Sequence, residues 1–352
     1  MKKQFTIALT GCAVLVAIYF STGTGSQIKS NTQTAADMSR VNEAISHEFP
    51  ASAQVEGVNI EAKPINSPAN KQTKNTVFSP AATYANWTNM KELLAKGEVN
   101  IEFEKQLIDS LRKTPNLQVY EEFKQLLEVV DSNLNTRNQE YLLSLLAVIN
   151  TEESVSLLLK TLENETITDS NAIYVAKKSL QQIAQSVAHI DQLEASFKTM
   201  SSDNQFLADV ANGIAKNAAE QNLDFLVAQV DAANDKSPIA MASMSNITNE
   251  RLVPQLQRLI NTRDAQSDLS IASLNTLATM GQYEAAIALI QWSAQQSLGS
   301  KAFVGELFST AAQRSPSTYR AIEKQLNRQQ FTSTEIKLVI EDIYSKKIEP
   351  VN

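Results

Sequence analysis

Six apolar residues recur along this chain at nearly constant spacing: Ile149, Ile183, Ile214, Ile247, Leu277 and Ala311. Each residue ends one apolar helical pattern, and a second pattern follows within a few residues. The steps between these six residues are 30 to 34 positions long. A nearly fixed period of this length is typical of stacked helix pairs, and one pair must pack on its neighbours to bury its apolar face. The sequence therefore predicts an all-α fold, a right-handed α-solenoid of antiparallel helix pairs.

The composition favours helices over strands. The chain of 352 residues contains only 9 Gly and 9 Pro, and aromatic residues make up 6%. Its segments are rich in Ala, Leu, Gln, Glu, Lys and Ser, which are mostly good helix formers. Short polar links such as Asn150–Glu152 and Gly281–Gln282 make the two helices of a pair antiparallel. We assign residues 85–352 to the helical-repeat domain.

Two segments resemble bacterial HEAT-type repeats. They are Leu142–Ala184 (LLSLLAVINTEESVSLLLKTLENETITDSNAIYVAKKSLQQIA) and Asn246–Ile290 (NITNERLVPQLQRLINTRDAQSDLSIASLNTLATMGQYEAAIALI). Each has a small apolar helix end, a polar turn, a Leu-rich second helix, a polar link and an Ala/Leu-rich first helix. The resemblance covers about residues 140–330 and implies a HEAT-like solenoid.

Residues 1–26 have the pattern of a signal peptide or signal anchor. Lys2 and Lys3 form a basic head, and residues 5–20 are uncharged and apolar. Three fates are compatible with this pattern: retention as a single-pass membrane anchor, cleavage within residues 21–26, or acylation of Cys12 in the lipobox-like Leu9–Cys12. The first places the C-terminal domain in the periplasm, and the others give a soluble periplasmic protein or a lipoprotein.

Residues 27–84 form a low-complexity tether rich in Ser, Thr, Asn, Gln and Pro, which predicts disorder. Residues 36–49 depart from this composition. Met38, Val41, Ile45 and Phe49 are spaced as on one face of a helix, and Pro50 ends the pattern. The segment is either a transient helix in a linker or a docking segment for the solenoid or a partner.

The inventory of catalytic residues is small. The chain has one cysteine and two histidines, His47 and His189, with no H-E-x-x-H or P-loop motif. We expect His189 to be a solvated helix start rather than a member of a catalytic triad. The sequence predicts no catalytic residue, no bound metal and no cofactor.

The charge argues against nucleic-acid binding. The formal net charge is −7, and because Lys2 and Lys3 are basic while residues 21–84 carry no net charge, the helical region carries −9. A protein that binds the phosphate backbone needs a basic surface.

The leading functional hypothesis is a non-enzymatic scaffold that binds another protein along a groove on the periplasmic side of a bacterial membrane. Alternatives are a membrane-anchored chaperone or foldase for a secreted client, and a helical-toroid enzyme. We expect the second helices to line the groove, with five candidate residues: Lys160, Lys198, Gln229, Arg258 and Gln291.

Overall fold

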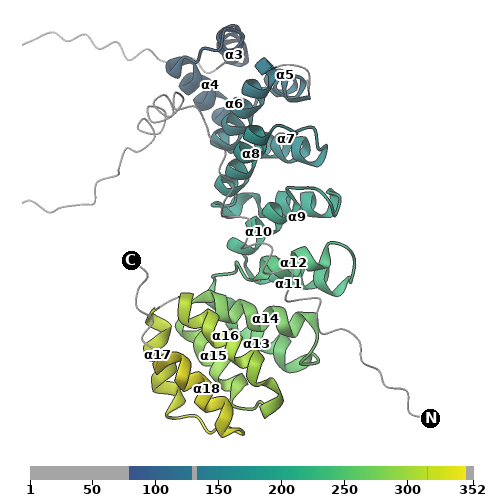
Figure 1. Cartoon of the computed structure of the whole chain (residues 1–352). Coiled ribbons are helices and arrows are strands. Elements are labelled where there is room, and N and C mark those ends of the chain that lie inside the picture. The colour runs from purple at the N-terminus through teal and green to yellow at the C-terminus, as the bar shows by residue number, and fades with distance from the viewer. Residues whose placement is uncertain (1–78, 129–132, 315, 346–352) are drawn as a thin grey trace, which may run out of the picture. The chain divides into compact units, whose positions relative to one another are not determined.

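The computed structural model describes residues 79–128, 133–314 and 316–345, and within these ranges the chain is all α-helical (Figure 1). This confirms the predicted all-α class. The apolar segment 5–20, Cys12 and the predicted helix 36–49 lie outside the described residues.

The described helices alternate between two sets. The first helices of the pairs are α4 (Ile101–Lys113), α6 (Asn133–Ile149), α8 (Ser170–Ile183), α10 (Leu207–Lys216), α12 (Ser237–Met244), α14 (Asp268–Met280), α16 (Lys301–Arg314) and α18 (Thr334–Ser345). The second helices are α3 (Pro80–Leu94), α5 (Leu117–Glu128), α7 (Glu152–Glu163), α9 (Ile190–Thr199), α11 (Glu220–Asp231), α13 (Val253–Thr262), α15 (Tyr283–Ser293) and α17 (Pro316–Leu326). Single 3₁₀ turns, η1 (Val187–His189), η2 (Glu250–Leu252) and η3 (Leu298–Ser300), precede α9, α13 and α16.

Packing is local along the chain. Each first helix contacts the next first helix, from α4 against α6 to α16 against α18. Among the second helices, α5 packs on α7, α7 on α9, α13 on α15 and α15 on α17, while α11 packs on α10, α12 and α14. Neighbouring pairs therefore bury one another's apolar faces, as repeats of this kind require.

The periodic apolar residues lie in this core. Ile149, Ile183, Ile214, Ile247, Leu277 and Ala311 are each at most 2% exposed. All of them lie within first helices except Ile247, which follows the end of α12 in the turn after it. Five of the six residues therefore lie at or near the end of a first helix, and Ile247 lies just beyond one.

The first described helix begins earlier than predicted. We placed the end of the tether at residue 84, but α3 begins at Pro80. The Ser79 hydroxyl caps it by accepting a hydrogen bond of 3.1 Å from the Ala82 amide, and Pro80 occupies the first helical turn. The prediction was wrong because the low-complexity composition outweighed this Ser-Pro start signal.

The described stack has an unpaired helix at each end. At the N-terminal end, α3 contacts α4 and α5 as a second helix does, with no described first helix before it. At the C-terminal end, α18 contacts α16 and α17 as a first helix does, with no described second helix after it. The exposed face of α3 consists of small and polar residues: Ala81, Ala85, Asn89 and Glu92. Such a face suits the end of a stack.

Side-chain amides connect successive pairs at the turns within the pairs. In each case the amide donates a hydrogen bond to a main-chain carbonyl near the end of the preceding first helix, where carbonyls have no partner inside the helix. The donors and acceptors are Gln182 and Ala147, Asn217 and Ala184, Asn249 and Ala218, and Gln282 and Thr248. The pairs are therefore joined by polar contacts as well as by apolar burial.

Candidate functional site: a cleft between two first helices

The five predicted groove residues lie on five successive second helices, α7, α9, α11, α13 and α15. Lys160, Lys198, Arg258 and Gln291 are exposed, and Gln229 is half-buried. They do not form one cluster. The Lys198 ammonium lies 5.1 Å from the centre of the Phe225 ring, and the Gln291 side-chain oxygen accepts a hydrogen bond of 3.3 Å from Gln257.

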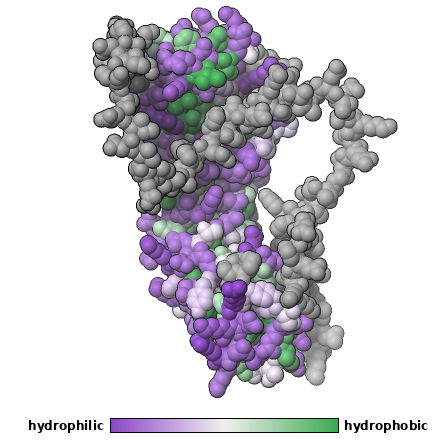
Figure 2. Space-filling model, turned by 90° about the vertical axis from the view of Figure 1, so that its left-hand side faces the viewer, coloured by the Kyte–Doolittle hydropathy of each residue, from purple (hydrophilic) through white to green (hydrophobic). Residues whose placement is uncertain are grey.

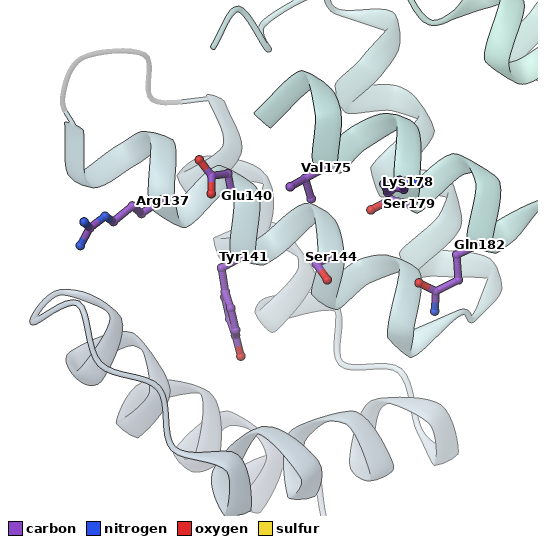
Figure 3. Close-up of a pocket in the computed structure, with 8 residues that line it drawn as sticks. All are labelled: Arg137, Glu140, Tyr141, Ser144, Val175, Lys178, Ser179 and Gln182. Carbon is purple, nitrogen blue, oxygen red and sulfur yellow. The ribbon is translucent and has the colours of Figure 1, made fainter. Parts of the chain in front are cut away.

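Two cavities of the described region lie elsewhere, between consecutive first helices. The larger has a volume of about 410 Å³ and lies between α6 and α8 (Figure 3). We call it the α6–α8 cleft, defined by its lining residues: Arg137, Glu140, Tyr141, Ser144, Val175, Lys178, Ser179 and Gln182. None of the five predicted groove residues lines either cavity, because those residues belong to the other set of helices.

The two walls of the α6–α8 cleft have the same spacing. On each helix the lining residues occur at positions i, i+3, i+4 and i+7, which lie on one face. Each lining residue of α6 is separated in sequence from its counterpart on α8 by the same number of residues as Arg137 is from Val175. The cleft is thus built from equivalent faces of two neighbouring repeats.

Hydrogen bonds hold the walls together. The Ser179 hydroxyl donates to the Leu143 carbonyl at 3.1 Å, and the Gln182 amide donates to the Ala147 carbonyl at 3.4 Å. On the far side of α8, Lys177 forms an ion pair of 3.5 Å with Asp209 of α10. These contacts fix α8 on both of its sides.

Two cations flank the cleft. Arg137 is exposed, and its guanidinium lies near the turn after α3, 3.9 Å from the position that a Cβ on Gly97 would take. The Lys178 ammonium lies 5.6 Å from the ring centre of Tyr174, which is 62% exposed. This arrangement gives the cleft a basic and aromatic rim in a helical region that is acidic as a whole.

Burial changes the titration of two lining residues. Burial and, to a lesser degree, the negative charge of Asp169 raise the pKa of Glu140, and Arg137 opposes the shift. Burial followed by the charge of Glu104 on α4 raises the pKa of Tyr141 far above its usual range. The Tyr141 ring points away from Glu140 (Figure 3), and its hydroxyl stays neutral at physiological pH. The charged side chains that line the cleft are Arg137, Lys178 and Glu140, and the carboxylates of Asp169 and Glu104 lie close by.

The smaller cavity, about 290 Å³, lies between α16 and α18. Its lining includes Lys301 and Glu335, whose charged atoms are 3.9 Å apart, and Leu338, which is 56% exposed. Its only lining cation is therefore paired with Glu335, whereas no ion pair joins two of the residues that line the α6–α8 cleft.

The prediction that His189 is solvated was wrong. The side chain is only 7% exposed, in the 3₁₀ turn that precedes α9. Its Nδ1 lies 3.0 Å from the side-chain oxygen of Gln192, whose amide donates to the Glu152 carbonyl of α7 at 2.9 Å. Gln192 therefore joins α9 to α7, and His189, the N-cap residue of α9, is buried beside it.

The described residues contain no group of three or more His, Cys, Asp or Glu side chains placed to hold a metal ion. In the same part of the chain, no helix has the length and hydropathy needed to span a membrane.

The residues that line the α6–α8 cleft were not predicted from the sequence. Their signal was present, because polar residues at helical spacing on α6 recur one repeat later on α8. The apolar period marks only the buried faces, and polar residues on a solvated face carry no marker of a cleft until the two helices are placed side by side.

Comparison of the chain with protein-family models gives no match. Comparison with curated proteins gives none either.

Proposed function

We propose that the chain is a HEAT-like α-solenoid that binds another protein and has no catalytic activity of its own. The observation that supports this best is the local packing of the helices. Because each pair contacts mainly its neighbours, the first helices and the second helices each present a long face to solvent. Extended faces of stacked repeats are typical binding surfaces.

Exposed aromatic residues on both sets of helices support the proposal. Tyr174 on α8 is 62% exposed and Tyr283 on α15 is 52% exposed. Tyrosine is enriched among the residues that contribute most to protein–protein binding. We favour the first-helix face around the α6–α8 cleft as the main binding surface, because it combines a cavity, two cations and an exposed ring.

We further propose that the helical region lies on the periplasmic side of a bacterial membrane. The support is the sequence pattern of residues 1–26, with a basic head before an apolar run. A thiol-reactive reagent that does not cross the inner membrane tests the placement. With Cys12 changed to Ala, a cysteine at the exposed Ser144 is expected to react in intact spheroplasts. If it reacts only after lysis, the placement is wrong.

Site-specific photocrosslinking in cells tests the binding proposal. A photoreactive amino acid placed at Tyr174 is expected to give a discrete adduct with one protein. The same residue placed at Lys160 or Arg258 samples the second-helix face in the same chain. An adduct from Tyr174 alone supports the first-helix face, an adduct from the second-helix positions alone supports the face predicted from the sequence, and no discrete adduct from either set contradicts the binding proposal.

A further inference from the structure

The surface beside the α6–α8 cleft combines exposed apolar side chains with positive charge. Val99 and Ile101, at the start of α4, are 49% and 81% exposed. They follow Gly97, the residue that lies next to the Arg137 guanidinium. In Figure 2, hydrophobic surface is visible near the upper end of the described region, among mostly hydrophilic residues. A ligand for this surface needs an apolar face and acidic groups.

Residues 36–49 of the same chain have this chemistry. Met38, Val41, Ile45 and Phe49 would form one apolar stripe in a helix. The segment also carries Asp37, Glu43 and Glu48 against a single Arg40, so its formal charge is −2. The residues that line the cleft have the opposite balance, with Arg137 and Lys178 against Glu140, and the carboxylates of Asp169 and Glu104 lie nearby.

The connecting chain brings the two together. Residues 50–78 separate Phe49 from Ser79, the cap of α3. A flexible linker of this length has a root-mean-square span of about 30 Å. Because α3 packs on α4 and α4 packs on α6, the linker ends within two helices of the cleft. Such a tether gives a local concentration of about a millimolar.

We propose that residues 36–49 bind as an amphipathic helix to the α6–α8 cleft of their own chain. The apolar stripe covers Val99, Ile101 and the apolar lining of the cleft, and the acidic residues face Arg137 and Lys178. An isolated helix of this length is marginal in water, so burial of its stripe supplies the stability that it lacks alone. The segment would then occupy the surface that we assign to a partner. The intramolecular contact can form whether or not such a partner exists.

Crosslinking between two introduced cysteines tests this inference in the full chain, solubilised in detergent. Cys12 is changed to Ala, and a short bis-maleimide joins Ser46→Cys in the segment to Ser144→Cys in the cleft. The matched control pairs Ser46→Cys with Lys160→Cys, which is exposed on α7, the other helix of the same pair. The cleft pair is expected to crosslink within one chain at least about tenfold faster than the control pair.

A second variant separates binding from mere proximity. Val41→Asp with Ile45→Asp disrupts the apolar stripe without touching the described helices, and it is expected to lower the cleft rate to the control rate. Arg137→Glu is expected to lower the cleft rate as well.

Three results would overturn the inference. Equal rates for the two pairs would show that the segment is not held at the cleft, and a preference that survives the stripe variant would show that tether proximity alone explains it. Crosslinks formed mainly between two chains would assign the cleft to a second copy.

Discussion

The indole nitrogen of Trp87 donates a hydrogen bond of 2.9 Å to the carboxylate of Glu122. The same carboxylate accepts hydrogen bonds of 2.6 Å from the Tyr84 hydroxyl and the Lys91 ammonium. All three donors lie on α3 and Glu122 lies on α5, so one carboxylate fixes α3 to the stack. The Trp87 ring also packs edge-on against Phe123, with ring centres 4.7 Å apart.

This contact predicts an acid-dependent detachment of α3. Hydrogen bonds from Lys91 and then Tyr84 lower the pKa of Glu122 from its ordinary value of 4.5. A lowered folded-state pKa stabilises the fold above the unfolded-state value, and the contribution is lost as pH falls below about 4.5 through the folded-state pKa. With Trp292→Phe, Trp87 is the only tryptophan, and its fluorescence is expected to shift to the red in this acid range.

The matched variant is Glu122→Gln, which removes the charge and keeps the shape. It is expected to weaken the docking of α3 by about 1–2 kcal/mol at neutral pH and to remove the acid transition below pH 4.5. If the variant keeps the same acid transition, another group controls the detachment.

Two helical glycines predict opposite responses to the same substitution. In an open helix interior, Gly→Ala stabilises by about 1 kcal/mol. A Cβ on Gly305 of α16 would meet only Val339, at an ordinary contact of 3.5 Å, so Gly305→Ala is expected to raise stability by up to this amount. A Cβ on Gly213 of α10 would lie 3.1 Å from Ala184 and 3.3 Å from Leu193.

Because Ala184 and Leu193 belong to the adjoining pair and are buried, we expect Gly213→Ala to be neutral or destabilising. Urea unfolding of the two single variants, followed by circular dichroism, measures the difference. Equal stabilisation by both variants would show that α8 and α9 can move away from α10 at little cost in free energy.

The amide contacts between pairs predict that Asn249→Asp destabilises the chain by about 1–3 kcal/mol. Asn249 accepts from the Arg251 amide, and its own amide donates to the Ala218 carbonyl at 3.1 Å. Aspartate keeps the first bond, but it replaces the donor with an oxygen that repels the carbonyl.

Asn100→Asp is the matched control. Asn100 caps α4 by accepting from the Glu102 and Phe103 amides, a role that aspartate fills equally well. Its unfolding free energy is expected to change by less than about 0.5 kcal/mol. Equal effects of the two substitutions would mean that the added charge, rather than the lost donor, is responsible.

The core of the repeats could be predicted from the sequence because burial constrains residue type at a nearly fixed period. Ile183 and Ile214 had to be apolar wherever their helices lie, and both are fully buried. The α6–α8 cleft could not be predicted in this way. Arg137 and Lys178 are far apart in the sequence, and only the packing of α6 against α8 makes them part of one cavity.

Two local features were also predicted wrongly, because the repeat period does not mark them. The start of α3 depended on a Ser-Pro pair inside a polar segment. The burial of His189 depended on a 3₁₀ turn that no apolar pattern marks. Both features involve very short segments, so the much longer period of the repeats carries no information about them.

The unpaired helices at the two ends of the described stack have a consequence for its length. A described segment that begins with a second helix and ends with a first helix contains only whole helix pairs between those two helices. Gain or loss of one pair by duplication or deletion in the middle therefore leaves α3 and α18 in place, and only the number of stacked pairs between them changes.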